Sequence, residues 1–290
     1  MKYIRGFAYF LLVIVIILIQ ACGRSNELDE SRLKTEIIHS KILGKDMKQK
    51  VYLPKEYGDG NKYPVLYFIH DGGGSADTVI YQYEIAQKSD ELVKNKQIEP
   101  LIIVAVRIDS SFGINSSTET TRVELQSQKV FDQGMYEDYI INEVIPYIDT
   151  QYSTISSREG RYIGGYSMGG FAALYIAFRY NNMFCKAGGH SPSLFIKEFP
   201  DKYISDWLYP DEDIRKNRDP IYIAREKDLS GLTVYLDTGE TDVNVEGCRL
   251  LYDILQKKGI ESELHLFPGT HSRSYCNMYM DKYLLFYTSK

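Results

Sequence analysis

The sequence predicts an α/β protein with a mostly parallel central sheet and helices on both faces. Continuous apolar runs of strand length occur at 63–69 and 101–106, as in strands buried on both sides. Helical apolar stripes alternate with such runs along the chain, which is the pattern of a parallel α/β sheet. Loops rich in glycine, serine, acids and histidine follow several of the expected strands. In sheets of this kind, sites form at the carboxyl ends of the strands.

The first half of the chain starts with two extended segments within 36–53. The run 48–54 alternates and stops at Pro54, as an antiparallel edge strand does. The polar stretch 108–133 has no clear period, and we expect a long functional or mobile loop there. The next helix, 135–152, contains Pro146, which ends or kinks it. The remaining expected elements are strands at 161–163, 184–189, 232–237 and 263–267, helices at 83–94, 171–180, 245–258 and 275–287, and a long insertion at 191–230.

The N-terminus reads as a leader. Lys2 and Arg5 precede the apolar run 7–19, which is short for a membrane span but suits a signal-peptide core. The small residue before Cys22 resembles the lipobox of bacterial lipoproteins; a plain secretory leader and a short uncleaved anchor are the alternatives. We therefore expect a lipoprotein signal peptide at 1–21, lipid on Cys22, a polar linker at 22–35 and one domain at 36–290. That organisation predicts attachment to a membrane of the bacterial cell envelope.

Composition excludes some classes of partner and site. The net charge of −5 argues against nucleic acid, which requires a basic face. Beyond Cys22 there are three cysteines, which allow at most one disulfide bridge. Cys248 and Cys276 both follow loops expected to carry chemistry, so this pair is the first candidate and Cys185 the leftover thiol. No cysteine or histidine cluster has zinc spacing, so we expect no metal site.

The segment Gly165-Tyr166-Ser167-Met168-Gly169 has the spacing of a nucleophile elbow, a sharp strand-to-helix turn that exposes a strained serine. Glycines two residues either side are needed there because a Cβ would collide with the neighbouring strand and helix. An apolar-leaning run precedes the motif and a helical run follows it. This context predicts that Ser167 is a nucleophile.

A serine hydroxyl needs a neighbouring base to remove its proton. Among the five histidines, His271 lies in a loop after the last strand and is the preferred base. The acid that orients this base is expected after the penultimate strand, where Asp242 is favoured and Asp237 and Glu240 stay open as alternatives. The order Ser…Asp…His is that of an α/β-hydrolase.

The oxyanion of the tetrahedral intermediate needs backbone N–H donors. Met168, the residue after the nucleophile, supplies one in this fold. Gly72 or Gly73, in the glycine run after the strand at 63–69, supplies the second without a side chain in the way. The run has neither the lysine nor the spacing of a phosphate loop.

These motifs together resemble a family of α/β-hydrolase esterases. The family contains esterase D-like enzymes, feruloyl esterases, siderophore esterases and mycolyltransferases of the antigen 85 type. The resemblance covers roughly 45–287 and rests on six segments, namely 63–75, 143–149, 165–170, 184–191, 239–242 and 269–271. It implies Ser167 as nucleophile, Asp242 as acid, His271 as base and no cofactor. Asp71 stands where the family more usually has glycine, which alters the oxyanion loop.

The resulting expectation is a membrane-tethered serine carboxylesterase that acts on acyl groups of carbohydrate, of the feruloyl or acetyl type. Alternatives are a siderophore lactone esterase, an acyltransferase to a sugar and a non-catalytic carbohydrate-binding lipoprotein. The segments 108–133 and 191–230 are the expected specificity walls. The candidate substrate contacts are Asp71, Gly73, Tyr166, His190 and Trp207. The sequence does not indicate an oligomeric state.

Overall fold

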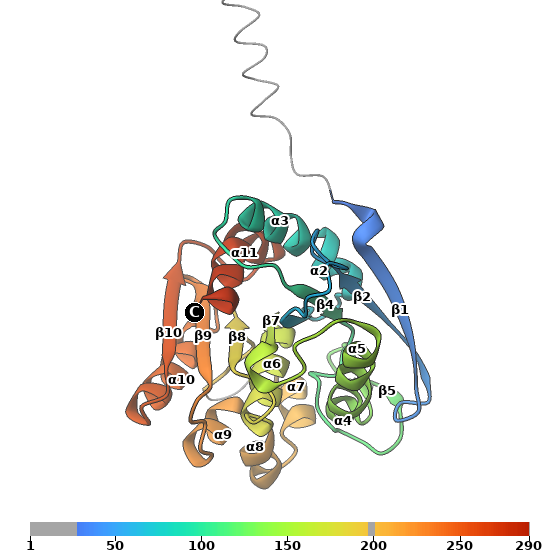
Figure 1. Cartoon of the computed structure of the whole chain (residues 1–290). Helices are drawn as coiled ribbons and strands as arrows, with labels where there is room; N and C mark the ends of the chain where they lie inside the picture. The colour runs from blue at the N-terminus through green and yellow to red at the C-terminus, as the bar shows by residue number, and fades with distance from the viewer. Residues whose placement is uncertain (1–27, 197–200, 290) are drawn as a thin grey trace, which may run out of the picture.

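The computed structural model describes residues 28–196 and 201–289 and contains a central sheet in the order β1-β2-β4-β3-β7-β8-β9-β10 (Figure 1). The six strands from β4 to β10 run parallel, and β1 and β2 join antiparallel at one edge. The expected mostly parallel sheet is therefore confirmed. Its strands are β1 (Leu33–Ser40), β2 (Lys45–Tyr52), β3 (Val65–Ile69), β4 (Ile102–Val106), β7 (Arg161–Tyr166), β8 (Lys186–His190), β9 (Thr233–Gly239) and β10 (Ser262–Phe267).

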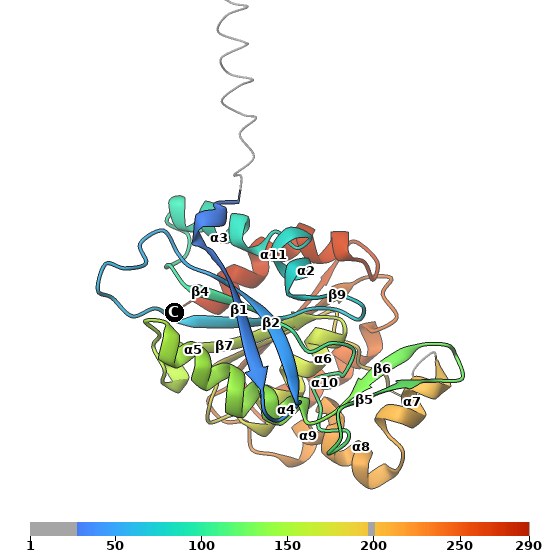
Figure 2. The same ribbon diagram turned by 90° about the vertical axis from the view of Figure 1, so that its right-hand side faces the viewer.

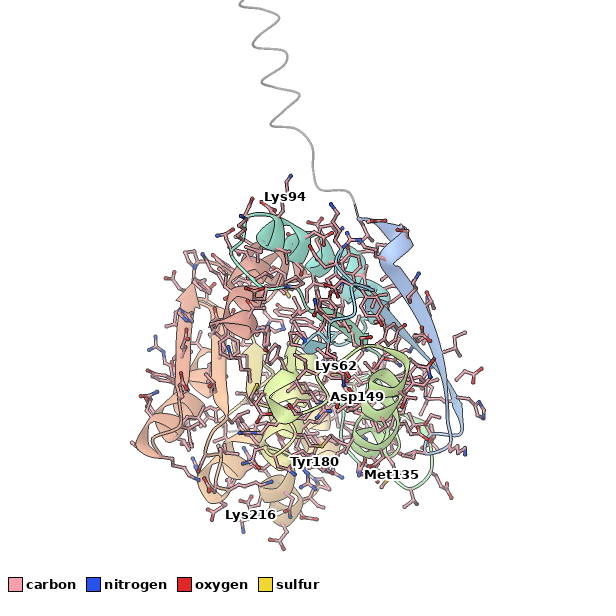
Figure 3. The ribbon with its side chains drawn as sticks, in the orientation of Figure 1. Lys62, Lys94, Met135, Asp149, Tyr180 and Lys216 are labelled. Carbon is pink, nitrogen blue, oxygen red and sulfur yellow. The ribbon has the colours of Figure 1, made fainter. Side chains whose placement is uncertain are left out.

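Helices cover both faces of this sheet. One layer is formed by α2, α3 and α11, and the other is formed chiefly by α4, α5, α6, α9 and α10 (Figure 1). Side chains fill the space between the sheet and each layer (Figure 3). The helices are α2 (Ala76–Tyr81), α3 (Ile85–Lys94), α4 (Tyr136–Tyr139), α5 (Ile145–Gln151), α6 (Met168–Arg179), α7 (Lys202–Leu208), α8 (Glu212–Arg218), α9 (Pro220–Glu226), α10 (Val245–Lys257) and α11 (Arg273–Thr288), with short turns η1 (Glu30–Arg32), η2 (Ile140–Val144) and η3 (Arg158–Gly160).

The central strands are apolar throughout because both of their faces are buried. In β3, Val65, Tyr67 and Ile69 pack into the core under α6, while Leu66 and Phe68 pack into the core under α11. This alternation follows from the two-residue period of a strand. Two cores on either side of one sheet hold the carboxyl ends of the strands at fixed positions.

The N-terminal boundary differs from the expectation. β1 begins at Leu33, inside the stretch expected as linker, and Arg32 donates hydrogen bonds to Asp90 and to the Leu53 carbonyl oxygen. The linker expectation was wrong for residues 30–35 because a polar strand at a sheet edge carries little apolar signal. β1, and not β2, is accordingly the edge strand. The expected leader 1–21 and Cys22 lie outside the described residues.

Two segments that gave weak signals in the sequence contain regular secondary structure in their described residues. The stretch 108–133 was expected to be structureless but contains a two-stranded hairpin, β5 (Thr121–Glu124) with β6 (Val130–Gln133). The insertion carries α7, α8 and α9, and Figure 2 shows α7 beside the hairpin. The helix around Pro146 continues through the π-helical turn η2, so this proline lies in the first turn of α5 and does not end the helix.

All three cysteines of the described residues are free thiols. The candidate bridge between Cys248 and Cys276 is absent from the described residues, because the sheet separates the two side chains. Cys248 lies on α10, whose apolar face packs into the core under α6, and Cys276 lies on α11 in the opposite core. Within the part of the chain that the structure describes, no helix is both long and apolar enough to cross a bilayer.

Candidate active site

Ser167 occupies the turn between β7 and α6. Its φ of 57° and ψ of −116° lie outside the regions that L-residues favour, so the backbone is strained there. A Cβ on Gly165 would lie 2.4 Å from the Gly169 carbonyl oxygen, and a Cβ on Gly169 would lie 2.2 Å from the Ile69 carbonyl oxygen. The two glycines let α6 pack close enough to β3 and β7 to hold this turn.

The Ser167 hydroxyl contacts an imidazole. Ser167 Oγ lies 2.8 Å from His271 Nε2, and His271 Nδ1 lies 2.8 Å from Asp242 Oδ2. Because a carboxylate only accepts, Nδ1 carries the proton and Nε2 is left to accept from the serine. His271 comes from the loop between β10 and α11, and Asp242 from the loop after β9. Three loops at the carboxyl edge of the sheet therefore bring these side chains into one hydrogen-bonded series.

The Asp242 carboxylate is fully buried and firmly held. The backbone N–H and the side-chain amide of Asn244 each donate to Asp242 Oδ1 at 2.9 Å. Burial alone raises the pKa of Asp242, but the hydrogen bond and charge of His271, with the Asn244 N–H, hold this pKa below its ordinary value. The carboxylate thus stays charged beside the imidazole.

The two alternative acids lie elsewhere. Glu240 is exposed. Asp237 is buried under the strand ends, where it contacts His190 Nδ1 at 2.8 Å and accepts hydrogen bonds from Tyr275 and Tyr283 at 2.7 and 2.9 Å. Among the three acids, Asp242 is the one that contacts His271.

His190 was expected to line the substrate pocket, and this expectation was wrong. The side chain is fully buried, its Nε2 lies 2.9 Å from the Tyr287 hydroxyl, and its ring stacks on Tyr283. As the last residue of β8, it turns away from the surface into the core under α11. Its carbonyl oxygen accepts the Ser167 N–H at 2.9 Å, which ties the turn to β8 through the backbone alone.

The glycine run after β3 lies across from Ser167. Gly72 and Gly73 both line the cavity that contains the serine, and Gly73 needs glycine because its φ is 73°. Met168 begins α6, so its N–H belongs to the first turn, where helices leave donors without intrahelical partners. Both backbone segments expected to supply an oxyanion hole thus border the same space.

Asp71 anchors this loop and does not line the cavity. Its carboxylate accepts hydrogen bonds from the Tyr83 hydroxyl at 2.6 Å and from Arg273 Nε at 2.8 Å. His70 fixes the loop from below, since its two ring nitrogens contact the Asp71 carbonyl oxygen and the Ile108 N–H. Asp71, where the family more usually has glycine, therefore attaches the glycine run to α11 through a partly buried ion pair.

The cavity above Ser167, which we call the serine cavity, has a volume of about 530 Å³. Its walls are largely apolar, with Phe112 and Phe131 from the 108–133 stretch and Phe195 and Ile204 from the insertion. Both expected specificity walls therefore border the site. Trp207 and Tyr166 were also expected to contact substrate. The Trp207 ring instead stacks behind the Phe131 ring, with the ring centroids 4.8 Å apart, and Tyr166 is buried beneath the His271 ring.

Sequence reasoning missed several residues of the site. Asn244, which holds Asp242, follows it by two positions, a spacing typical of an Asx turn. Ser193 Oγ lies 3.4 Å from Ser167 Oγ. Lys129 at the hairpin and Asp201 before α7 form an ion pair of 3.1 Å at the cavity wall. No sequence signal joins these last two, because they lie far apart on segments without a visible period.

Comparisons with known proteins identify relatives of this chain. A family model described as "Putative esterase" matches residues 40–286. The uncharacterised protein YjcH of Bacillus subtilis is 26% identical over 251 residues, which cover 81% of this chain and 89% of that protein. The endo-1,4-β-xylanase/feruloyl esterase of Xylanibacter ruminicola is 28% identical over 164 residues, or 54% of this chain, but the match spans only 21% of that longer protein.

The fold is also similar to solved structures. A ferulic acid esterase superposes with a TM-score of 0.72 at 22% identity, covering 88% of this chain and 97% of that chain. At this identity the likeness establishes the fold, an α/β-hydrolase sheet with helices on both sides. The evidence for family membership is the match of the family model to residues 40–286.

Proposed function

The chain belongs to this esterase family and is a serine ester hydrolase, and we propose that Ser167, His271 and Asp242 are its catalytic residues. The single observation that carries the proposal is the hydrogen-bonded series Ser167 Oγ, His271 Nε2 and Nδ1, Asp242 Oδ2, with 2.8 Å at both steps. The strained turn keeps the hydroxyl at the floor of the serine cavity, where an ester carbonyl has access to it.

In the proposed reaction, Ser167 Oγ attacks the ester carbonyl carbon while His271 Nε2 takes the hydroxyl proton. The carbonyl oxygen becomes an oxyanion that accepts hydrogen bonds from the backbone N–H groups of Met168 and Gly72. When the intermediate collapses, the alcohol leaves with the proton held by His271, and the acyl group stays bonded to Ser167. Water then attacks the acyl-enzyme with His271 again acting as base, which releases the carboxylic acid.

Asp242 has an electrostatic and orienting role in this mechanism. It accepts from Nδ1 and thereby leaves Nε2 free to take the serine proton. Its negative charge stabilises the imidazolium that forms in both half-reactions. The two Asn244 donors keep the carboxylate in place and ionised.

We further propose an aromatic acyl group, of the feruloyl type, attached to carbohydrate. Phe112, Phe131 and Phe195 give the serine cavity several aromatic walls, which suit a planar ring. The relative from Xylanibacter ruminicola is named as both a xylanase and a feruloyl esterase, which supports the same class of ester. An acetyl group would leave most of a cavity of about 530 Å³ unfilled.

The location in the cell is a separate proposal. The leader 1–21, with Cys22 after its apolar core, supports a lipoprotein tethered to a membrane of the bacterial cell envelope. Metabolic labelling with a palmitate analogue tests it: label should enter the wild-type chain and not Cys22→Ala. Equal labelling of both would rule out lipid on Cys22.

The proposed reaction is tested with the full-length chain and a panel of feruloylated arabinoside, acetylated xylan and a catecholate trilactone. We expect the feruloyl ester to have the highest kcat/KM and a fluorophosphonate probe to label wild type but not Ser167→Ala. Preference for the trilactone would replace the proposed acyl group. Ester products formed from an added sugar alcohol would indicate acyl transfer in place of hydrolysis, and labelling of both variants would exclude Ser167 as nucleophile.

A further inference from the structure

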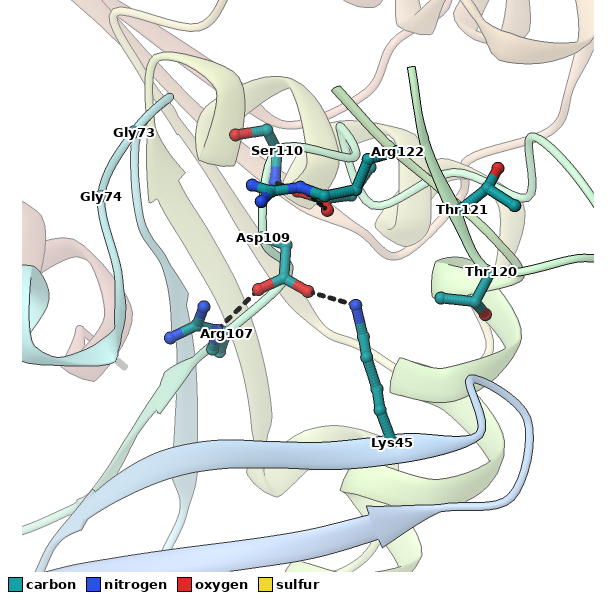
Figure 4. A pocket seen from close by; sticks show the side chains of 10 residues that line it. Lys45, Gly73, Gly74, Arg107, Asp109, Ser110, Thr120, Thr121 and Arg122 are labelled. Atoms are coloured by element: carbon teal, nitrogen blue, oxygen red, sulfur yellow. Dashed lines mark hydrogen bonds and ion pairs between the residues drawn. The ribbon is translucent and has the colours of Figure 1, made fainter. Parts of the chain in front are cut away.

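A second cavity borders the glycine run on the side away from His271. It has a volume of about 620 Å³ and is lined by charged side chains from three segments (Figure 4). Lys45 comes from the start of β2, Arg107 and Asp109 follow β4, and Arg122 and Asp132 lie on the β5–β6 hairpin. We call it the cationic cavity. The proposed esterase mechanism uses none of these five side chains.

The two carboxylates of the cationic cavity already have partners. Asp109 accepts from Arg107 Nε at 2.6 Å and from Lys45 Nζ at 2.9 Å, the two contacts drawn in Figure 4. Burial alone raises the pKa of Asp109, but the hydrogen bonds from Lys45, Arg107 and Tyr136 lower it to about 2. Asp132 accepts the Ser110 N–H at 3.0 Å and pairs with Arg122 Nε at 3.1 Å. Three cations against two carboxylates leave one net positive charge.

The guanidinium groups keep their outer edges available. Within the described residues, Arg107 and Arg122 contact their aspartates through Nε. The two terminal nitrogens of each guanidinium group can therefore donate to a ligand. The side chains are 42% and 73% exposed. Arginine forks of this kind suit the two oxygens of a carboxylate. The net charge matches a monoanion better than a phosphate dianion.

The cationic cavity adjoins the serine cavity. Gly73 and Ser110 line both, so the glycine run that borders the reaction centre also forms a wall of the cationic cavity. A substrate held at Ser167 can therefore extend past Gly73 into it. The whole chain has a net charge of −5, which repels anions, so this local excess of cations marks a place where an anionic group is favoured.

We propose that the cationic cavity binds a carboxylate carried by the ester substrate, which makes esters bearing a carboxylate better substrates than their neutral counterparts. This inference rests on the proposed function, because it adds a specificity to the same reaction. The carboxylate has two possible sources: an acidic sugar in the alcohol part, or the far end of a dicarboxylic acyl group.

The test compares kcat/KM within two matched pairs of esters hydrolysed by the full-length chain. One pair is the feruloyl ester of a methyl glucuronoside and that of methyl glucoside; the other is para-nitrophenyl hemiglutarate and para-nitrophenyl valerate. We expect the charged member of one pair to be preferred by about tenfold at low ionic strength, and the pair that shows it identifies the source. The preference should shrink as salt is added, because the two guanidinium groups are exposed.

Arg107→Gln and Arg122→Gln should each reduce the charged-to-neutral ratio several-fold. The matched control is Arg249→Gln on α10, an exposed arginine with its own acidic neighbour, which should leave the ratio at the wild-type value. Equal kcat/KM within both pairs, with neutral esters still hydrolysed, would overturn this inference and leave the proposed function standing. Loss of the proposed function would instead appear as no hydrolysis of any of the four esters. Salt dependence of the wild type provides a test free of folding effects.

Discussion

Two histidine–aspartate pairs in this protein have the same contact and different surroundings. His271 with Asp242 and His190 with Asp237 both have Nδ1 2.8 Å from a carboxylate oxygen. The His271 side chain is 34% exposed and its Nε2 meets Ser167 Oγ, whereas His190 is fully buried and its Nε2 meets the Tyr287 hydroxyl. The pair alone therefore does not indicate catalysis. What distinguishes the first pair is that its second nitrogen faces the hydroxyl of Ser167, the proposed nucleophile, on the floor of a cavity.

The largest expected effect comes from removing the proposed nucleophile. Ser167→Ala should lower kcat on a feruloyl ester by about 10⁴-fold or more, as expected when one member of a serine–histidine pair is removed. Urea unfolding should remain close to wild type, because alanine needs no more space in the turn. Activity within tenfold of wild type would exclude this serine.

Asp242→Asn should lower kcat by about 10³- to 10⁴-fold, because an amide in this place no longer selects the imidazole tautomer that accepts at Nε2. KM should change much less. The matched control is Glu240→Gln in the same loop, whose side chain is exposed and which should retain wild-type kcat. A similar loss in both variants would point to the loop and not to the carboxylate.

The buried pair should show the opposite pattern. Asp237→Asn should reduce the free energy of unfolding by about 2–4 kcal/mol, because the carboxylate has three buried partners whose hydrogen bonds are disrupted. The kcat of the folded fraction should fall by less than about tenfold. Chemical denaturation and active-site titration with a fluorophosphonate separate the two effects. A loss of kcat as large as that of Asp242→Asn would remove the distinction between the pairs.

Stability should fall as the pH falls below 6.5. Burial lowers the pKa of both His70 and His190 from the ordinary 6.5, so the unfolded chain takes up protons in this window that the folded chain does not. Each histidine adds a slope of up to about 1.4 kcal/mol per pH unit, with stability rising as pH rises. The slope of stability against pH is measured from the midpoints of urea unfolding between pH 5 and 8. A profile that is flat across this window would contradict the assignment.

The smallest effect concerns one hydroxyl. Tyr287→Phe removes the donor to His190 Nε2 and should cost about 1 kcal/mol in the free energy of unfolding. The kcat should stay within twofold of wild type, because Tyr287 has no contact with the serine cavity. A large kcat effect would mean that the buried pair positions Ser167 through β8.

The sequence predicted the parallel sheet and the elbow well because each depends on local features. The glycines around Ser167, the apolar runs of β3 and β4 and the loop order all leave visible patterns. The sequence favoured Asp242 but left Asp237 and Glu240 open, because all three lie close together at the end of β9 and only the path of the loop brings one of them to His271. The β5–β6 hairpin was missed because its exposed strands lack an apolar alternation. The three insertion helices have seven residues each, too few for a clear period.

The β5–β6 hairpin borders both cavities and gives each of them a different kind of side chain. Phe131 faces the serine cavity, while the next residue, Asp132, faces the cationic cavity together with Arg122. The hairpin adds no strand to the main sheet, yet it supplies apolar side chains to the serine cavity and charged side chains to the cationic cavity. Replacing this one hairpin would therefore change both cavities together, while Ser167, His271 and Asp242 stay on the loops of the main sheet.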